Sequence, residues 1–196
     1  YNFVPGVMGL LLMLICSMMT AVSIVEEKEM GTMELVLVSP VKPFWIILSK
    51  LIPYLFLSLI NFVSVLLLAH YVMEVPVRGS LTLLSFSALI FVGSSLGLGL
   101  LVSVISKTQQ TAMLLCGMGL TMPTMLLSGI IFPCESMPVA LQALSDVIPA
   151  KWFIIIVKKI MIQGVGLQEI AKELTVLSGM AVFLLWVSVK NFKTRL

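Results

Sequence analysis

The chain has 196 residues, of which 60% are hydrophobic and only 11% are charged. Soluble domains usually carry about 25% charged residues, so this composition excludes a water-soluble globular protein. The net charge of +3 at pH 7 is too small, and the basic residues are too scattered, for a nucleic-acid-binding surface. We therefore expect an integral membrane protein that contacts lipid and binds no nucleic acid.

Five segments are long and apolar enough to cross a bilayer as α-helices. They are residues 4–25, 45–72, 80–106, 109–131 and 171–189. The last segment is short, so Lys172 and Glu173 are expected at its rim, where long side chains reach the lipid headgroups. The pattern predicts an all-α membrane protein in which residues 1–196 form a single transmembrane domain.

The first connecting segment, residues 26–44, carries a dense cluster of charges that hydrocarbon cannot accommodate. Five spans place the two ends of the chain on opposite sides of the membrane. The positive-inside rule then puts Lys28, Lys42 and the basic C-terminal residues in the cytoplasm. We therefore expect the loop 26–44 and the C-terminus to be cytoplasmic and residues 133–170 to be external.

The external segment, residues 133–170, contains no apolar piece long enough to span, because its longest uncharged one is 152–157. Leu141 and Leu144 recur at helical spacing, and the remaining face is polar, which predicts a short helix lying at the membrane boundary. A second interfacial helix is expected at 152–161. The segment is therefore predicted to be an external helical hairpin.

No set of residues points to catalysis or to a metal site. The single histidine, His70, lies near the outer end of the second span, which favours an interfacial hydrogen bond over a proton relay. The cysteines, Cys16, Cys116 and Cys134, lack metal-ligand spacing. The sequence also lacks a phosphate-binding loop and an acidic residue inside a span. We expect no enzyme activity and no bound cofactor, so any uphill transport would be driven by a partner.

The loop 26–44 is predicted to contain a short helix. Gly31 permits a sharp turn, Thr32 is expected to cap the helix, and Glu34 lies in its first turn, where the helix dipole favours an anion. Residues 35–38 are apolar, and Pro40 stops the helix. Such a helix could dock into a groove of another protein, or it could rest on lipid headgroups.

Two separated stretches resemble a known family. Glu-Lys-Glu-Met-Gly-Thr-Met-Glu at 27–34, followed by Leu-Val-Ser-Pro at 37–40, is similar to the coupling segment of type-two ATP-binding cassette (ABC) exporter permeases. Ser-Gly-Ile-Ile-Phe-Pro at 128–133, with Leu-Gln-Ala-Leu-Ser at 141–145 and Trp-Phe at 152–153, resembles the external re-entrant helices of the same family. The two matches lie in the right order and on the predicted sides, which favours the docking interpretation of the short helix.

The resemblance implies a dimeric permease, built from two identical or two different copies, in a bacterial inner membrane. A separate ATPase subunit would hold ATP and Mg and contact the coupling loop, and a drug, a lipid or a similar apolar molecule would be exported. Such permeases usually have six spans, so an earlier span is expected upstream. The residues assigned to coupling are Glu27, Glu29, Gly31, Thr32, Glu34, Leu37, Ser39 and Pro40. Those assigned to the external hairpin are Phe132, Pro133, Pro138, Leu141, Leu144 and Pro149.

Three further residues are assigned to helix packing. Gly93 and Gly97 form a small-residue step that allows two helices to approach closely, either within this chain or across two copies. Asn61 lies near the middle of its span, where an interhelical hydrogen bond is favoured over a substrate contact. Two other functions stay open from the residues alone: a carrier or channel that works without a partner, and a membrane scaffold that transports nothing.

Overall fold

The computed structural model describes the backbone of residues 3–194 and the side chains within that range except those of 37, 43, 193 and 194. All regular secondary structure in this range is helical, which confirms the all-α prediction. Five helices are long and apolar enough to cross a membrane, as expected. The side chain of Leu37, one of the predicted coupling residues, lies outside the described residues.

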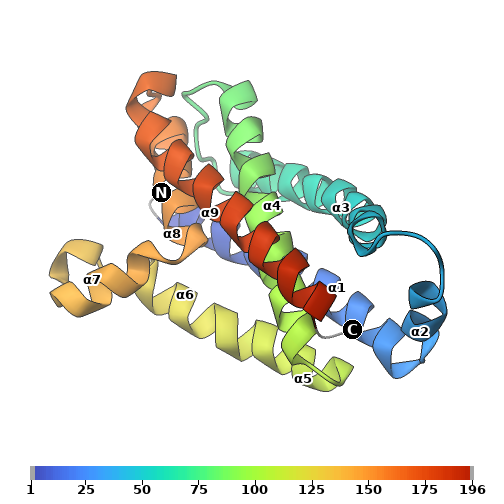
Figure 1. Ribbon diagram of the computed structural model, residues 1–196. Coiled ribbons are helices and arrows are strands. Elements are labelled where there is room, and N and C mark those ends of the chain that lie inside the picture. The colour runs from blue at the N-terminus through green and yellow to red at the C-terminus, as the bar shows by residue number, and fades with distance from the viewer. Residues whose placement is uncertain (1–2, 195–196) are drawn as a thin grey trace.

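Four of the five spans are single helices, which are α1 (Phe3–Glu29), α3 (Pro43–Tyr71), α4 (Leu81–Ile105) and α9 (Leu167–Thr194). The fourth span in chain order is composite: α5 (Gln109–Leu114), the π-helix η1 (Leu115–Leu120) and α6 (Thr121–Leu127) follow one another without a break. It ends earlier than residue 131, because Gly129 turns the chain with a positive φ of 82°. Figure 1 shows α5 and α6 as one long arm at the edge of the bundle.

Helix α4 lies between α1 and α9, and two glycines allow this close packing. A Cβ on Gly99 would lie 2.6 Å from the backbone oxygen of Ser17 in α1, and one on Gly97 would lie 3.1 Å from Cβ of Leu184 in α9. The missing side chains therefore let three backbones approach closely, as small residues do in membrane helix bundles. α1 and α4 form the centre of the molecule, while α3 and the α5–α6 arm lie at its periphery (Figure 1).

The predicted Gly93–Gly97 step is used only in part within this chain, and a contact across two copies stays a prediction. A Cβ on Gly93 would meet nothing within 4 Å, so only Gly97 of the pair contacts another helix of this chain. Gly97 also accepts a hydrogen bond at its carbonyl from the Ser188 hydroxyl of α9, at 2.8 Å. The contacting pair is Gly97 and Gly99, which face opposite sides of α4, because helix rotation rather than spacing along the sequence decides which glycines meet a neighbour.

The segment after the fourth span contains the 3-10 turn η2 (Cys134–Ser136), α7 (Val139–Asp146), α8 (Pro149–Lys158) and the π-helix η3 (Lys159–Gln163). The axes of α7 and of the continuous α8–η3 helix differ by 86°, which is the geometry of a broken span or of a re-entrant pair. α7 is largely exposed, in agreement with a boundary helix. The second expected interfacial helix corresponds to α8, which packs within the protein, because Phe153 and Ile156 are fully buried. Its position relative to the membrane stays a prediction.

The position of α8 follows from its composition. Most of its side chains are apolar, and a helix of that kind is stable where protein or lipid surrounds it. The Phe153 ring stacks on Phe91 of α4, with ring centroids 4.2 Å apart and planes at 2°. The main core of the molecule lies where α1, α4 and α8 meet.

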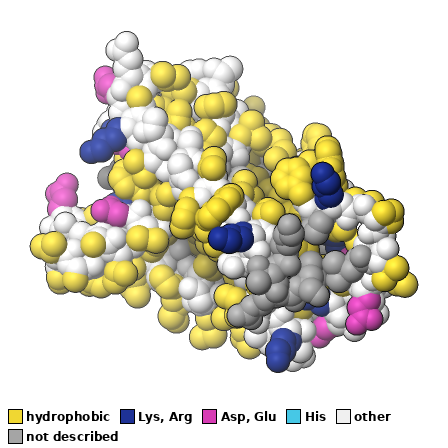
Figure 2. Space-filling model, in the orientation of Figure 1, with side chains coloured by type: hydrophobic (Ala, Val, Ile, Leu, Met, Phe, Trp, Pro, Cys, Tyr) yellow, Lys and Arg dark blue, Asp and Glu magenta, His cyan; other side chains and the backbone are white. Residues whose placement is uncertain are grey.

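The short helix α2 (Thr32–Leu37) follows α1 directly. The described N- and C-terminal parts of the chain lie at opposite ends of the bundle, the C-terminal part near α2 and the N-terminal part near α8 (Figure 1). We call these the α2 end and the α7 end. Figure 2 shows hydrophobic side chains spread across the bundle between them, with acidic side chains near the two ends.

Candidate functional site

The α2 end presents apolar side chains that no described part of the chain covers. Leu35 is 75% exposed and Val38 is 85% exposed, and Met30 and Val41 are exposed beside them. We call these four residues the α2 surface. Met33 points the other way and is buried against Ile24 of α1, Ile47 of α3, Leu100 of α4 and Phe192 of α9. α2 is thus anchored through Met33 while its opposite side is available to a partner.

The start of α2 differs from the predicted cap. Gly31 holds the N-cap position with a φ of 71°, and Thr32 is the first helical residue. The Thr32 hydroxyl donates to the Glu27 backbone oxygen at 3.2 Å, so it ties α2 to α1 instead of capping α2. The chain changes direction within the two residues that separate α1 from α2, and a glycine in the left-handed conformation allows that turn without strain. Glu34 is exposed in the first turn, as expected from the helix dipole.

The other predicted coupling residues surround this helix. Glu27 and Glu29 belong to the last turn of α1. Ser39 is half-buried and Pro40 is exposed immediately after α2, where the helix has already ended at Leu37. The residues assigned from the sequence therefore lie together at one end of the molecule, and their role in coupling stays a prediction.

The last turn of α1 also makes three long-range polar contacts that the sequence did not reveal. Glu27 forms an ion pair with Lys50 of α3. The Lys28 ammonium donates to the Ser103 backbone oxygen of α4 at 2.6 Å. The Gln109 amide of α5 donates to Glu29 Oε2 at 2.9 Å. The partners lie 23 to 80 positions away in the chain, so no local pattern indicates them.

At the α7 end, an apolar cavity of about 440 Å³ separates α6 from η2 and α7. Three of the predicted hairpin residues line it, namely Phe132, Pro138 and Leu141. The other three lie elsewhere: Pro133 and Leu144 are exposed, and Pro149 is buried at the first position of α8. The lining is almost entirely carbon, so the cavity suits an apolar molecule or a lipid chain.

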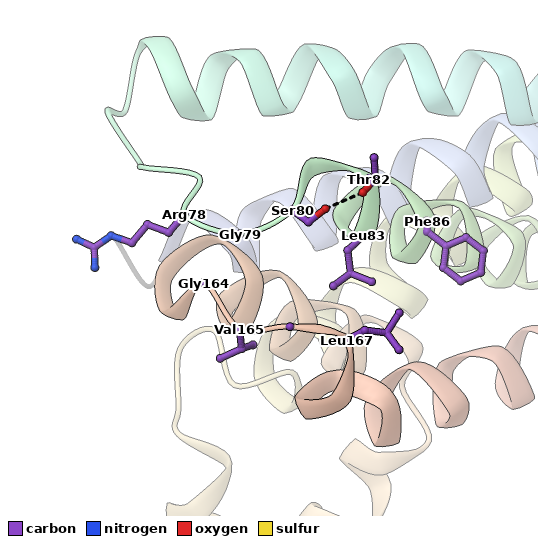
Figure 3. A pocket seen from close by; sticks show the side chains of 10 residues that line it. Arg78, Gly79, Ser80, Thr82, Leu83, Phe86, Gly164, Val165 and Leu167 are labelled. Atoms are coloured by element: carbon purple, nitrogen blue, oxygen red, sulfur yellow. Dashed lines mark hydrogen bonds between the residues drawn. The ribbon is translucent and has the colours of Figure 1, made fainter.

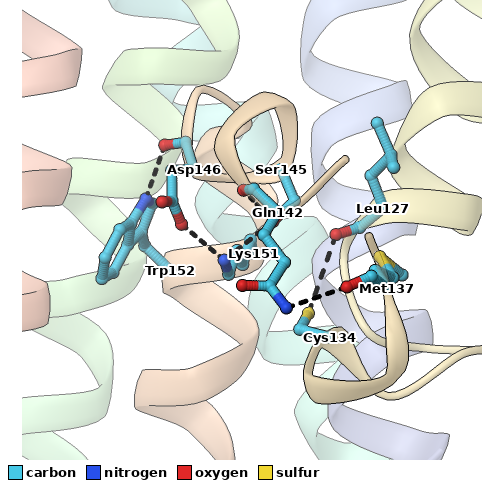
Figure 4. Close-up of polar contacts among 8 residues, drawn as sticks. All are labelled: Leu127, Cys134, Met137, Gln142, Ser145, Asp146, Lys151 and Trp152. Atoms are coloured by element: carbon cyan, nitrogen blue, oxygen red, sulfur yellow. Dashed lines mark hydrogen bonds and ion pairs between the residues drawn. The ribbon is translucent and has the colours of Figure 1, made fainter. Parts of the chain in front are cut away.

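Polar contacts fix the sharp bend between α7 and α8 (Figure 4). The Lys151 ammonium donates to Ser145 Oγ at 2.8 Å and to Asp146 Oδ1 at 2.5 Å. The Trp152 indole donates to the Asp146 backbone oxygen at 2.9 Å. Each of these contacts joins α8 to the end of α7, so together they hold the 86° angle. These contacts were not predicted from the sequence, although Asp146 and Lys151 lie on either side of Pro149 at a spacing that allows an ion pair.

A second cavity at the same end, of about 580 Å³, lies between the start of α4 and the turn before α9. Ser80 and Thr82 face each other there, with their hydroxyl oxygens 2.6 Å apart. Arg78 also lines this cavity, and Figure 3 shows its side chain extending outward. The cavity is thus lined by two hydroxyl groups and one basic side chain, with no acid or histidine among its lining residues to complete a catalytic set.

The structure also shows the contacts of three polar side chains that the sequence singled out. Asn61 is half-buried on α3, and none of the described residues accepts or donates a hydrogen bond to its side chain. His70 is exposed and packs edge-on against Tyr71. Glu173 was expected at the rim of the last span, yet α9 begins at Leu167 and the Glu173 side chain is largely buried in an ion pair with Lys159, at 2.8 Å.

The sequence model of the family described as "ABC-2 family transporter protein" matches residues 1–190. The chain belongs to the ABC-2 transporter family. This agrees with the resemblance drawn from the loop after α1 and from the re-entrant segment. The family assignment also supports a transport subunit rather than an enzyme, and five apolar spans make the chain an integral membrane protein.

Similar curated proteins are also ABC transporter proteins. The "Probable multidrug ABC transporter permease YbhS" of Escherichia coli K12 is 34% identical over 161 residues, which cover 82% of this chain and 43% of that protein. The "Probable multidrug ABC transporter permease YbhR" of Escherichia coli K12 is 33% identical over 171 residues, which cover 87% of this chain and 46% of that protein. "ABC transporter G family member 20" of Dictyostelium discoideum is 30% identical over 94% of this chain and 26% of that protein.

The chain spans less than half the length of these relatives. No solved structure matches the chain with statistical significance.

Proposed function

We propose that this chain is the translocating part of an ATP-driven exporter, and that α2 docks onto a separate ATPase subunit. The proposal rests on the exposed apolar residues of the α2 surface. Its exposed residues lie just beyond the charged last turn of α1, which ends a span. Side chains such as Leu35 and Val38 are costly to leave in water, and a groove on a soluble partner would cover them.

The charge distribution supports a cytoplasmic position for this end. Lys28, Lys42, Lys50, Lys107 and Lys190 all lie at or near the α2 end of the spans. Basic residues flanking spans are retained preferentially on the cytoplasmic side of bacterial inner membranes. ATP and Mg would be bound by the partner, since this sequence contains no phosphate-binding loop.

The substrate class follows from the surfaces that are free to line a pathway. Few side chains in the spans of α3 and of the α5–α6 arm are buried within the chain. Such faces suit lipid, a second permease copy, or an apolar substrate that moves between two copies. The carbon-lined cavity beside α7 lies on the opposite end from α2, where export would finish. A hydrophobic or amphipathic molecule fits these surfaces, and the names of YbhS and YbhR refer to multidrug transport.

The test places a charge on the α2 surface of the complete transporter. In Leu35→Asp and Val38→Asp variants, we expect the ATPase subunit to be lost during purification of the permease, because a docked apolar side chain becomes a desolvated carboxylate. Val147→Asp is the matched control, since Val147 is 70% exposed but lies between α7 and α8. Normal ATPase recovery with both α2 variants would refute the docking proposal.

A further inference from the structure

Three consecutive residues at the end of α1 contact three different helices. Glu27 pairs with Lys50 of α3, Lys28 binds the end of α4, and Glu29 binds the start of α5. We propose that these residues form a junction that transmits movement of α2 to the spans, separately from the docking of the ATPase. The inference rests on the proposed function, and it assigns Glu27, Lys28 and Glu29 as positioning residues for transport.

Helix geometry explains why one turn can reach three neighbours. Successive side chains on an α-helix point about 100° apart, so three in a row cover more than half of the circumference. The last turn of α1 projects beyond the tightly packed middle of the bundle, where long polar side chains have room to extend sideways. α3, α4 and α5 surround it there, and each receives one contact.

The contact from Lys28 acts on a helix end. Ser103 lies in the last turn of α4, where backbone oxygens have no partner within the helix. A cation at this position satisfies such an oxygen and also interacts favourably with the negative end of the helix dipole. Gln109, the partner of Glu29, is the first residue of α5. Lys28 and Glu29 therefore hold the two sides of the turn that joins α4 to α5.

The same turn of α1 is bound directly to α2. The Thr32 hydroxyl donates to the Glu27 oxygen, and the Gly31 amide donates to the Lys28 oxygen at 3.3 Å. A displacement of α2 consequently acts on the backbone of residues that already contact three spans. Packing through Met33 adds an apolar contact among the same helices, but it is close to non-directional. The polar contacts fix the direction in which each span is pulled.

The Glu27–Lys50 pair provides the sharpest test, because its charges can be exchanged. We expect Glu27→Lys and Lys50→Glu each to reduce transport per ATP hydrolysed by about tenfold, an effect between those of exposed and buried ion pairs. The double variant with both changes restores the pair in the opposite sense, so its transport should recover to within about twofold of the unchanged protein. Glu26→Lys is the control, since Glu26 makes no side-chain hydrogen bond or ion pair with the described residues.

The experiment is performed on the complete transporter in proteoliposomes, with recovery of the ATPase subunit and transport per ATP measured on the same samples. Retained ATPase, reduced transport in the single variants and recovery in the double variant would support the junction. Loss of the ATPase in the single variants would overturn it, since these residues would then serve docking. Unchanged transport in the single variants, or no recovery in the double variant, would also overturn it. The Leu35→Asp result tests docking independently.

Discussion

The short helices α2 and α8 lie at opposite ends of α1 and are held in contrasting ways. α8 is buried on nearly all sides, with Phe153 stacked on Phe91 and Ile154 fitted against Gly9 of α1. α2 is anchored by Met33 and by hydrogen bonds to the last turn of α1, while its other apolar side chains are exposed. Close packing on all sides resists displacement. The comparison indicates that α8 is enclosed by the protein, whereas α2 is covered by the described residues on one side only.

The largest effect on stability is expected from the core of the α7 end. Phe153→Ala removes a fully buried ring that stacks on Phe91, and it should lower the free energy of unfolding by about 3 kcal/mol. Leu144→Ala, on the exposed side of α7, should change it by no more than about 0.5 kcal/mol. Thermal unfolding in detergent measures both. Equal effects of the two substitutions would contradict the buried position of α8.

The next largest loss of stability is expected from a change in the close packing of α4. Gly99→Ala would place a methyl group against the Ser17 backbone oxygen, which is not free to move aside, so we expect a loss of about 2 kcal/mol. Gly93→Ala is the control, because its methyl group would meet open space and alanine favours the helix. The ratio of folded to aggregated protein after heating measures the difference. If Gly93→Ala were the more damaging change, the contacting face of α4 would be wrongly assigned.

Disturbing the bend between α7 and α8 is expected to lower the free energy of unfolding less than the two changes above. Lys151→Met removes the contacts to Ser145 and Asp146 but keeps most of the apolar stem, so a loss of about 1 kcal/mol is expected. Hydrogen exchange should rise in α7 and stay low in α8. Lys158→Met, on the same helix, should leave exchange in α7 unchanged, since Lys158 makes no side-chain hydrogen bond with the described residues. A rise confined to α8 would contradict the assignment of the bend.

The spans could be predicted from the sequence because hydropathy alone determines them. The position of α8 could not, because six apolar residues between charged ones have the same pattern in an interfacial helix and in a helix surrounded by protein. The hydrogen bonds of Lys28 to Ser103 and of Glu29 to Gln109 could not be predicted either, since they depend on where α4 ends and α5 begins in space. For Gly31 and Thr32, the residue types indicated a turn and a helix start, but the exact cap position depended on how sharply the chain leaves α1.

A small effect on stability is expected at α2, combined with a large effect on transport. Glu34→Lys reverses a charge in the first turn of an exposed helix, which should cost at most about 1 kcal/mol. Membrane insertion should therefore be normal, while ATP hydrolysis becomes uncoupled from transport. Glu34→Gln should retain more transport than Glu34→Lys, because it introduces no repulsive charge. Normal transport by Glu34→Lys would show that this side of α2 is not part of the docking surface.

Labelling of Val38 would show whether α2 lies in the cytoplasm and contacts an ATPase there. A Val38→Cys variant, with Cys16, Cys116 and Cys134 replaced by alanine, would be treated with a membrane-impermeant maleimide. We expect labelling in inverted membrane vesicles but not in intact cells, and protection of the cysteine when the ATPase subunit is bound. Labelling of Val38→Cys in intact cells, or equal labelling with and without the ATPase, would contradict the account.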